Sequence, residues 1–185
     1  MLKATNANKF FKYIESYNDF PKKDVIYWDF TPMLEDPSIF RDAITGIMNH
    51  YGNRNIDKIA AIEAKGFIIG SCLAYEMKKP LVLIRKSGLL PGMTINERFV
   101  KEYGEAEYQM KQNSIKKGEN VLIVYDILAG PGATCAAIRL VERLGGVVVG
   151  CTYILELGYL KARHQLSNYD ILSLVNIKDK ISKKD

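Results

Sequence analysis

Short apolar runs alternate with longer amphipathic stretches through most of the chain. The apolar runs occupy residues 59–62, 81–84, 121–124, 147–155 and 171–175. Between them, residues 67–77 and 132–144 have the apolar spacing of helices. Strands without alternating polar positions are buried on both faces, which is typical of parallel sheets covered by helices. The pattern therefore predicts an α/β fold with a doubly wound, mainly parallel sheet and flanking helices.

Two parts of the chain depart from this alternation. In the N-terminal third, the pattern predicts a helix over residues 4–17, an irregular segment over 19–30 and a helix over about 38–51, and we expect residues 1–35 to form a hood. Residues 94–110 mix apolar and charged positions too irregularly for a core helix. They predict a mobile hairpin, because a long excursion beyond a buried strand is where a lid over a site is found.

The composition agrees with an ordinary globular protein. The chain has 185 residues, of which 48% are hydrophobic and 25% charged, and it contains no linker or repeat. We expect a single domain over residues 1–178 and a basic tail over 179–185. Neither a membrane-spanning run nor a signal peptide is visible, and the three cysteines form no CxxC pair. These features predict a cytoplasmic protein without disulfides and without a membrane partner.

The formal charge of +5 suits an anionic ligand or a nucleic acid. Part of that excess lies in the tail, so we expect no nucleic-acid partner. The two histidines, His50 and His164, have no other metal-ligating residue type near them in the sequence. We therefore expect no metal site built from protein side chains.

The segment over residues 121–134 is the most informative in the chain. A buried strand ends at the acidic Asp126, and a turn containing Gly130 and Gly132 leads into a helix. Such a turn brings backbone N–H groups and a helix N-terminus to a phosphate, while Asp126 can accept hydrogen bonds from sugar hydroxyls. A sugar phosphate fits better than a triphosphate because the Gly-Lys-Ser/Thr ending of a P-loop is absent. The alternatives are a plain strand-to-helix turn capped by Asp126, and a dinucleotide fingerprint in which Cys135 replaces the third glycine.

Several motifs stand in order along residues 20–175. They are Phe20-Pro21-Lys22, Asp29-Phe30-Thr31-Pro32, Glu63-Ala64-Lys65-Gly66-Phe67, the stretch RKSGLLPG at 85–92, Glu102-Tyr103-Gly104, the Asp126 turn and Arg143-Leu144-Gly145-Gly146. This ordered set resembles the type I phosphoribosyltransferases, and most closely the adenine phosphoribosyltransferases.

The resemblance implies a reaction and a homodimer. The ribose 5-phosphate moiety of phosphoribosyl pyrophosphate would pass to N9 of adenine, giving AMP and pyrophosphate, with Mg²⁺ carried by the donor. The resemblance places the ribose hydroxyls on Asp126 and pyrophosphate near Lys65, Arg85 and Lys86. The catalytic pair would be Glu102 and Tyr103, with Glu102 taking up the proton of adenine at N7. The 5-phosphate would lie on the residues of the glycine turn: Ala129, Gly130, Gly132, Ala133 and Thr134.

Adenine would be read by the backbone of the irregular N-terminal segment, at Val25, Ile26 and Trp28. Without the resemblance, Arg85 and Lys86 have the alternative interpretation of a solvated strand end. The pair Glu102 and Tyr103 likewise has the alternative interpretation of an acid that happens to lie beside an aromatic residue.

Some positions depart from the family pattern. Tyr125 stands where the first of two adjacent acids is expected, and residues 130–133 replace a Thr-Gly-Gly-Thr loop, which removes two hydroxyl donors and one N–H. Thr134, the next residue, is the candidate to return one hydroxyl. Trp28 and Lys65 each replace an arginine, and Leu89 replaces a lysine, so weaker binding of the donor is expected.

Two further hypotheses follow from these departures. The chain could be a catalytically impaired homologue with a degenerate donor loop that binds a nucleotide or phosphoribosyl pyrophosphate in a regulatory role. It could also be a phosphoribosyltransferase for hypoxanthine, guanine or xanthine, although the arrangement of Glu102 and Tyr103 favours adenine.

Overall fold

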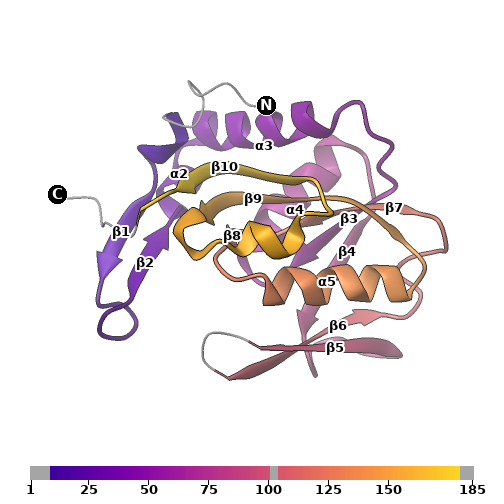
Figure 1. Ribbon diagram of the computed structural model, residues 1–185. Coiled ribbons are helices and arrows are strands. Elements are labelled where there is room, and N and C mark those ends of the chain that lie inside the picture. The colour runs from indigo at the N-terminus through magenta and orange to yellow at the C-terminus, as the bar shows by residue number, and fades with distance from the viewer. Residues whose placement is uncertain (1–8, 101–103, 180–185) are drawn as a thin grey trace.

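The computed structural model describes residues 9–100 and 104–179, and its centre is a sheet with the strand order β10-β9-β7-β3-β4-β6-β5 (Figure 1). The parallel part consists of β3 (Lys58–Ile62), β4 (Leu81–Lys86), β7 (Asn120–Val124), β9 (Val147–Leu157) and β10 (Ile171–Ile177). At one edge β6 (Glu105–Lys111) and β5 (Thr94–Val100) continue the sheet in antiparallel pairing. The predicted doubly wound, mainly parallel sheet is confirmed.

Helices cover both faces of this sheet. On one face α3 (Pro37–Tyr51) and α4 (Lys65–Glu76) pack over Leu122 and Ile154. On the other face α5 (Gly132–Arg143) packs over Ile123 and Tyr153. Successive strand residues point to opposite faces, so each apolar run supplies both layers of the core. Burying one such isoleucine or leucine contributes about 1.5–3 kcal/mol, which explains why the runs predicted these strands well.

The carboxyl ends of the central strands lie side by side. Ile62 of β3 is in register with Ile84 of β4, and Ala61 is in register with Val124 of β7. The residues at or just beyond these ends therefore share one edge of the sheet. This edge gathers most of the residues that the sequence singled out for binding.

The hood differs from its prediction. Residues 9–11 are helical, but β1 (Glu15–Asn18) pairs antiparallel with β2 (Ile26–Asp29), and α2 (Thr31–Glu35) follows. The predicted helix over residues 4–17 is therefore wrong in its second half, and the segment predicted as irregular contains a strand. The reason is tertiary, because the apolar spacing near residue 14 fits a helix while the strand depends on pairing with Trp28 and its neighbours. Trp28 itself is buried in the core.

The predicted hairpin is present as β5 (Thr94–Val100) and β6 (Glu105–Lys111). It packs against α5, where the Glu97 carboxylate pairs with Arg139 at 2.6 Å and with Arg143 at 2.9 Å. A Cβ on Gly132 would lie 2.6 Å from the backbone oxygen of Val100. The end of β5 thus closely approaches the start of α5, and only glycine allows that approach.

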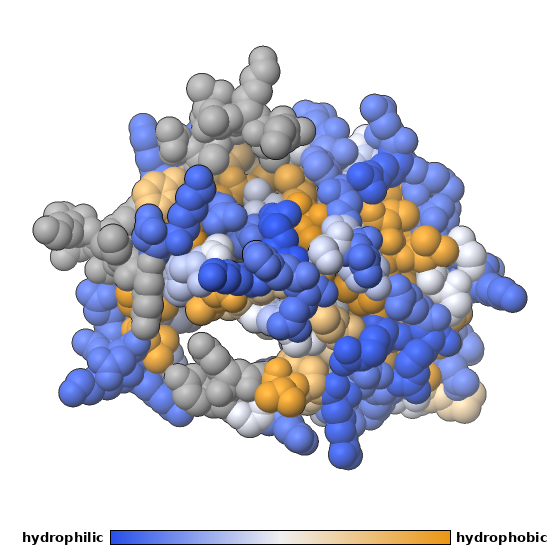
Figure 2. All heavy atoms as spheres, in the orientation of Figure 1, coloured by the Kyte–Doolittle hydropathy of each residue, from blue (hydrophilic) through white to orange (hydrophobic). Residues whose placement is uncertain are grey.

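The remaining elements are the short strand β8 (Ile127–Leu128), which pairs with β9, and the 3-10 helices η1 (Gly158–Leu160) and η2 (Ala162–Leu166). Figure 2 shows the surface hollowed between the β1–β2 hairpin and the start of α5. None of the helices in the described residues combines the length and the apolar character needed to cross a bilayer.

Candidate active site

Asp126 lies between the end of β7 and β8. Its backbone oxygen accepts hydrogen bonds from the N–H groups of Ile154 and Leu155, both at 3.1 Å, which fix the turn against β9. Burial raises the pKa of the Asp126 carboxyl, against the opposing effects of the Ile127 N–H and the Lys65 ammonium. In the described part of the chain Asp126 forms no ion pair. Its carboxylate can therefore accept hydrogen bonds from the hydroxyls of a ligand.

The glycine turn follows directly and ends at α5. Gly130 is exposed, and Ala129 and residues 131–133 are half-buried. The first hydrogen bond of the helix runs from the N–H of Cys135 to the oxygen of Pro131 at 2.8 Å. The N–H groups of residues 132–134 therefore precede the hydrogen-bonded ladder and are oriented along the helix axis. Together with the helix dipole they favour an anion at this turn.

The Thr134 hydroxyl is expected from the sequence to serve as a donor in the glycine turn, but in the structure it faces the core. The Thr134 side chain is 1% exposed, and its hydroxyl lies 2.8 Å from the hydroxyl of Tyr153 in the core beneath α5. The hydroxyl is engaged there, so Thr134 offers the turn its N–H group rather than a side-chain donor. No local pattern predicts this pairing, because Tyr153 lies 19 residues away on β9.

The Glu63 side chain holds Arg85 and Lys86 at the same edge of the sheet. The Glu63 carboxylate accepts a hydrogen bond from Nε of Arg85 at 3.0 Å and from the N–H of Lys86 at 3.1 Å. The guanidinium also donates to the backbone oxygen of Leu89 at 3.0 Å. Glu63 thus fixes the end of β4 next to the end of β3. Its partnership with Arg85 was not predicted, although both residues lie in the motifs that carry the family resemblance.

Lys65, the first residue of α4, connects the sheet edge with the hood. Its ammonium donates to the Tyr27 hydroxyl at 2.9 Å and lies 3.5 Å from the Asp29 carboxylate. Burial acts to lower the pKa of Lys65, but the Tyr27 hydrogen bond and the nearby Asp126 and Asp29 outweigh it, so that the pKa is raised. Lys65 is therefore a cation at neutral pH.

The hood residues expected to read a base lie along β2. The backbone of Val25 already takes part in the β1–β2 turn, since its N–H donates to Lys22 at 3.2 Å and its oxygen accepts from Phe20 at 3.3 Å. Ile26 is half-buried, whereas Trp28 is 3% exposed and packs into the core. The indole N–H of Trp28 is buried without a partner in the described structure. Any contact of Trp28 with a base would therefore come from its backbone.

Tyr125, the residue in place of an acid, is half-buried beside the start of α4. Its ring is close enough that a Cβ on Gly66 would lie 3.4 Å from it, and its hydroxyl is 3.5 Å from that of Tyr108 on β6. Burial raises the pKa of Tyr125, so its phenol is neutral at physiological pH. Glu102 and Tyr103, the predicted catalytic pair, lie outside the described residues.

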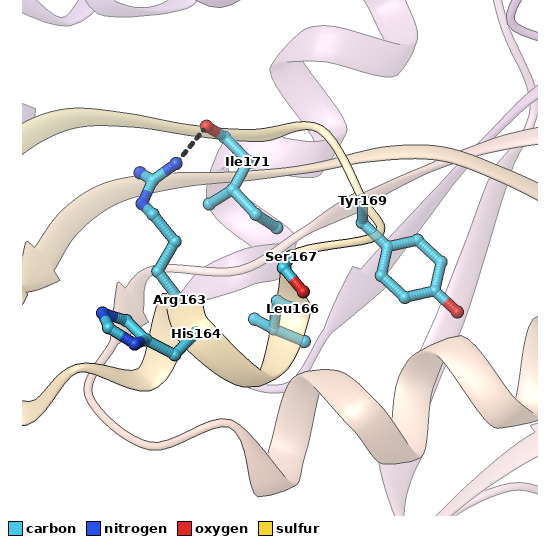
Figure 3. A pocket seen from close by; sticks show the side chains of 6 residues that line it. All are labelled: Arg163, His164, Leu166, Ser167, Tyr169 and Ile171. Atoms are coloured by element: carbon cyan, nitrogen blue, oxygen red, sulfur yellow. Dashed lines mark hydrogen bonds between the residues drawn. The ribbon is translucent and has the colours of Figure 1, made fainter.

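Two surface cavities lie away from this edge. One, of about 410 Å³, is lined by Arg163, His164, Leu166, Ser167, Tyr169 and Ile171 (Figure 3). The other, of about 480 Å³, adjoins it at Tyr169 and includes Asn120 and Val147 at the amino ends of β7 and β9. Neither contains a residue that the sequence predicted for binding. Among the described residues no group of three His, Cys, Asp or Glu side chains could hold a metal ion.

Comparisons with known proteins agree with this geometry. Residues 33–182 match the family model of the phosphoribosyl transferase domain. The adenine phosphoribosyltransferase of Thermosipho melanesiensis is 44% identical over 89% of this chain and 94% of its own length.

Two solved structures share the fold. The adenine phosphoribosyltransferase of Thermoanaerobacter pseudethanolicus has a TM-score of 0.88 and 36% identity, covering 92% of this chain and 99% of its own. That of Saccharomyces cerevisiae, in complex with adenine and an imino-altritol bisphosphate, has a TM-score of 0.86 and 32% identity, with the same coverage of both chains. This chain therefore belongs to the phosphoribosyl transferase family and has the type I phosphoribosyltransferase fold.

Proposed function

We propose that the protein transfers the ribose 5-phosphate moiety of phosphoribosyl pyrophosphate to N9 of adenine, forming AMP and pyrophosphate in purine salvage. One arrangement carries the proposal: a buried strand delivers the Asp126 carboxylate next to a glycine turn at the N-terminus of α5. A pentose with one phosphate fits this arrangement, because its hydroxyls can donate to the Asp126 carboxylate and its phosphate can accept from the N–H groups of the turn. The adenine phosphoribosyltransferases among the relatives support adenine as the base.

In this proposal the backbone of residues 129–134 binds the 5-phosphate. Pyrophosphate lies near Lys65, Arg85 and Lys86, whose charges stabilise the leaving group as the bond between C1 and the pyrophosphate oxygen breaks. Glu63 supports this role because it orients Arg85 and the end of β4. The bond between N9 and C1 forms as the leaving group departs.

Magnesium enters with the donor. Its preferred ligands are oxygens, and Asp126 supplies a carboxylate at the ribose end of the proposed site. When bound, the ion neutralises part of the charge on the pyrophosphate. The chain's own part is to hold the donor between Asp126 and the cations of the sheet edge.

The base occupies the hollow beside the hood. Backbone groups of β2 at Ile26 and Trp28 read the edge of adenine, and Val25 takes part through the free lone pair of its oxygen. Glu102 takes up the proton that adenine loses, and Tyr103 follows it in the sequence, between β5 and β6. The close approach of Val100 to Gly132 supports this part of the proposal, since it holds the hairpin next to the glycine turn.

A catalytically impaired, nucleotide-binding homologue is the second candidate. The hydroxyl of Thr134 is engaged with Tyr153, and the turn itself has no other hydroxyl side chain. The 5-phosphate would then depend on N–H groups alone. Each missing charge-assisted hydrogen bond weakens binding of the donor by about 1.5–3 kcal/mol. Release of pyrophosphate from the bound donor is the property that separates the two candidates.

We also propose a homodimer in the cytoplasm. Ile68 and Tyr75 of α4 and Leu83 of β4 are 42%, 82% and 37% exposed on neighbouring elements, and a second copy would cover them. The free thiols of Cys72, Cys135 and Cys151 are typical of a reducing compartment.

The test is a spectrophotometric assay with phosphoribosyl pyrophosphate, Mg²⁺ and each of adenine, hypoxanthine, guanine and xanthine. We expect AMP formation from adenine alone and its loss in Glu102→Gln. Tight binding of the donor or of AMP without release of pyrophosphate would favour the impaired homologue. Turnover of another purine in preference to adenine would contradict the proposed base.

A further inference from the structure

The ammonium of Lys65 is enclosed by side chains of the hood. It donates to the Tyr27 hydroxyl at 2.9 Å and lies 3.5 Å from Asp29, 5.2 Å from the centre of the Tyr27 ring and 5.1 Å from that of Phe30. Aromatic faces attract a cation at these distances. The lysine side chain is flexible because its four-carbon stem rotates freely. These contacts therefore hold the ammonium in one position.

Both acceptors are held in place by other residues. The ring of Phe20 meets that of Tyr27 edge-on, with centroids 5.1 Å apart, and Tyr27 pairs with Tyr17 across the β1–β2 hairpin. The Asp29 carboxylate accepts hydrogen bonds from the N–H and the hydroxyl of Thr31. The hood therefore holds both hydrogen-bond acceptors of Lys65 in fixed positions.

These contacts leave the Lys65 ammonium one N–H donor for a ligand. A lysine ammonium has three N–H donors, of which Tyr27 and Asp29 occupy two. The Lys65 side chain is 27% exposed, so the hood does not enclose it completely. Asp126 is near enough to act on the charge of Lys65, which brings the cation close to the proposed ribose site.

We infer that Tyr27 is a positioning residue whose hydroxyl and ring hold the Lys65 ammonium with its third N–H directed to a phosphate group of phosphoribosyl pyrophosphate. This inference rests on the proposed function. Tyr27 lies on β2 between Ile26 and Trp28, so the strand proposed to read adenine also sets a cation of the donor site. The Tyr27 hydroxyl thus fixes the direction of the Lys65 ammonium, whereas the planar guanidinium of an arginine at this position would need no such support.

The test compares Tyr27→Phe with the wild-type enzyme. The phenylalanine ring retains the contact with Phe20 and the aromatic face, and only the hydroxyl is lost. We expect the KM for phosphoribosyl pyrophosphate to rise about tenfold, while kcat and the KM for adenine change less than twofold. Tyr13→Phe is the matched control, because that hydroxyl binds Asp36 in the same hood at 2.9 Å, and we expect no change in KM.

The same substitution in a Lys65→Arg background separates positioning from folding. Arginine binds a phosphate through two parallel donors, so removing the Tyr27 hydroxyl there is expected to change the KM less than twofold. An equal tenfold loss in both backgrounds, or an unchanged KM in Tyr27→Phe itself, would overturn the inference while leaving the proposed function intact. A wild-type protein that neither forms AMP nor binds the donor would overturn the proposed function and this role together.

Discussion

Asp126, the residue proposed to bind the ribose, has a buried carboxyl whose charge is unfavourable. Burial raises its pKa in the folded protein, so the folded state binds the proton more tightly than the unfolded state does. Its contribution to stability is fully present below the unfolded pKa and is lost as the pH rises through the folded pKa. Ionisation of the buried carboxyl therefore lowers the free energy of unfolding as the pH rises. A group kept at such a cost is typical of a functional site.

We predict that Asp126→Asn raises the free energy of unfolding at pH 7 and lowers AMP formation at least about tenfold, since the charged acceptor of the ribose hydroxyls is lost. Urea unfolding and the AMP assay, carried out on the same preparation, measure both quantities. Loss of stability together with loss of activity would show a purely structural role for this carboxylate.

Asp36 provides the opposite case. Hydrogen bonds from Ser38, Ile39 and Tyr13 at the start of α3 lower its pKa to about 2. Its contribution to stability is therefore present above the ordinary aspartate pKa of 3.8 and is lost as the pH falls toward 2. We expect Asp36→Ala to destabilise the protein at pH 7, with a smaller loss at pH 2.5 and an unchanged KM for both substrates. Equal destabilisation at both pH values would refute this account of the cap.

The residues that the sequence could identify are those whose role follows from a local motif. Asp126 is predicted from its place after an apolar run, and Arg85 from a motif that carries the family resemblance; the binding roles of both stay predictions. The contacts of Lys65 with Tyr27 and of Thr134 with Tyr153 join residues 38 and 19 positions apart, and no local pattern encodes them. Those contacts depend on which elements the fold brings together.

At the scale of elements, the β5–β6 hairpin is tied to α5 by Glu97. Burial acts to raise the pKa of Glu97, but Arg139 and Arg143 outweigh it and lower the pKa below the ordinary glutamate value of 4.5. These two ion pairs are therefore present above that value and are lost as the pH falls. Both arginines are about half-exposed, so each pair contributes only about 0.2–1 kcal/mol.

We predict that Glu97→Gln increases amide hydrogen exchange in β5 about fivefold at pH 7 and changes the melting temperature little. The matched control is Glu105→Gln at the start of β6, a residue that forms no ion pair in the described part of the chain. Equal exchange rates in wild type and Glu97→Gln would show that other contacts hold the hairpin to α5.

At this scale the sequence predicts buried strands better than exposed ones. The strands β3, β7, β9 and β10 are apolar runs largely buried on both faces, so composition alone indicates them. The run of β4 is apolar too, although Leu83 on it is 37% exposed. By contrast, β1 has mostly exposed residues and exists because β2 pairs with it. Its sequence satisfied a helical pattern equally well, and only the tertiary partner decides between the two.

For the whole molecule, the exposed apolar side chains on α4 and β4 predict the assembly. We expect light scattering to give twice the chain mass of 20.9 kDa for the wild type and about 20.9 kDa for Tyr75→Glu, which places a charge in the proposed interface. Leu160→Glu is the control, since Leu160 is 42% exposed on η1, and it is expected to remain dimeric. A monomeric wild type would contradict the proposed homodimer.

The most direct test of the central claim is a crystal structure of the protein with bound AMP. We predict the 5-phosphate on the N–H groups of residues 132–134, with the ribose hydroxyls on the Asp126 carboxylate and the adenine beside β2. A phosphate bound elsewhere, or a Tyr125 ring occupying the pentose position, would contradict the account.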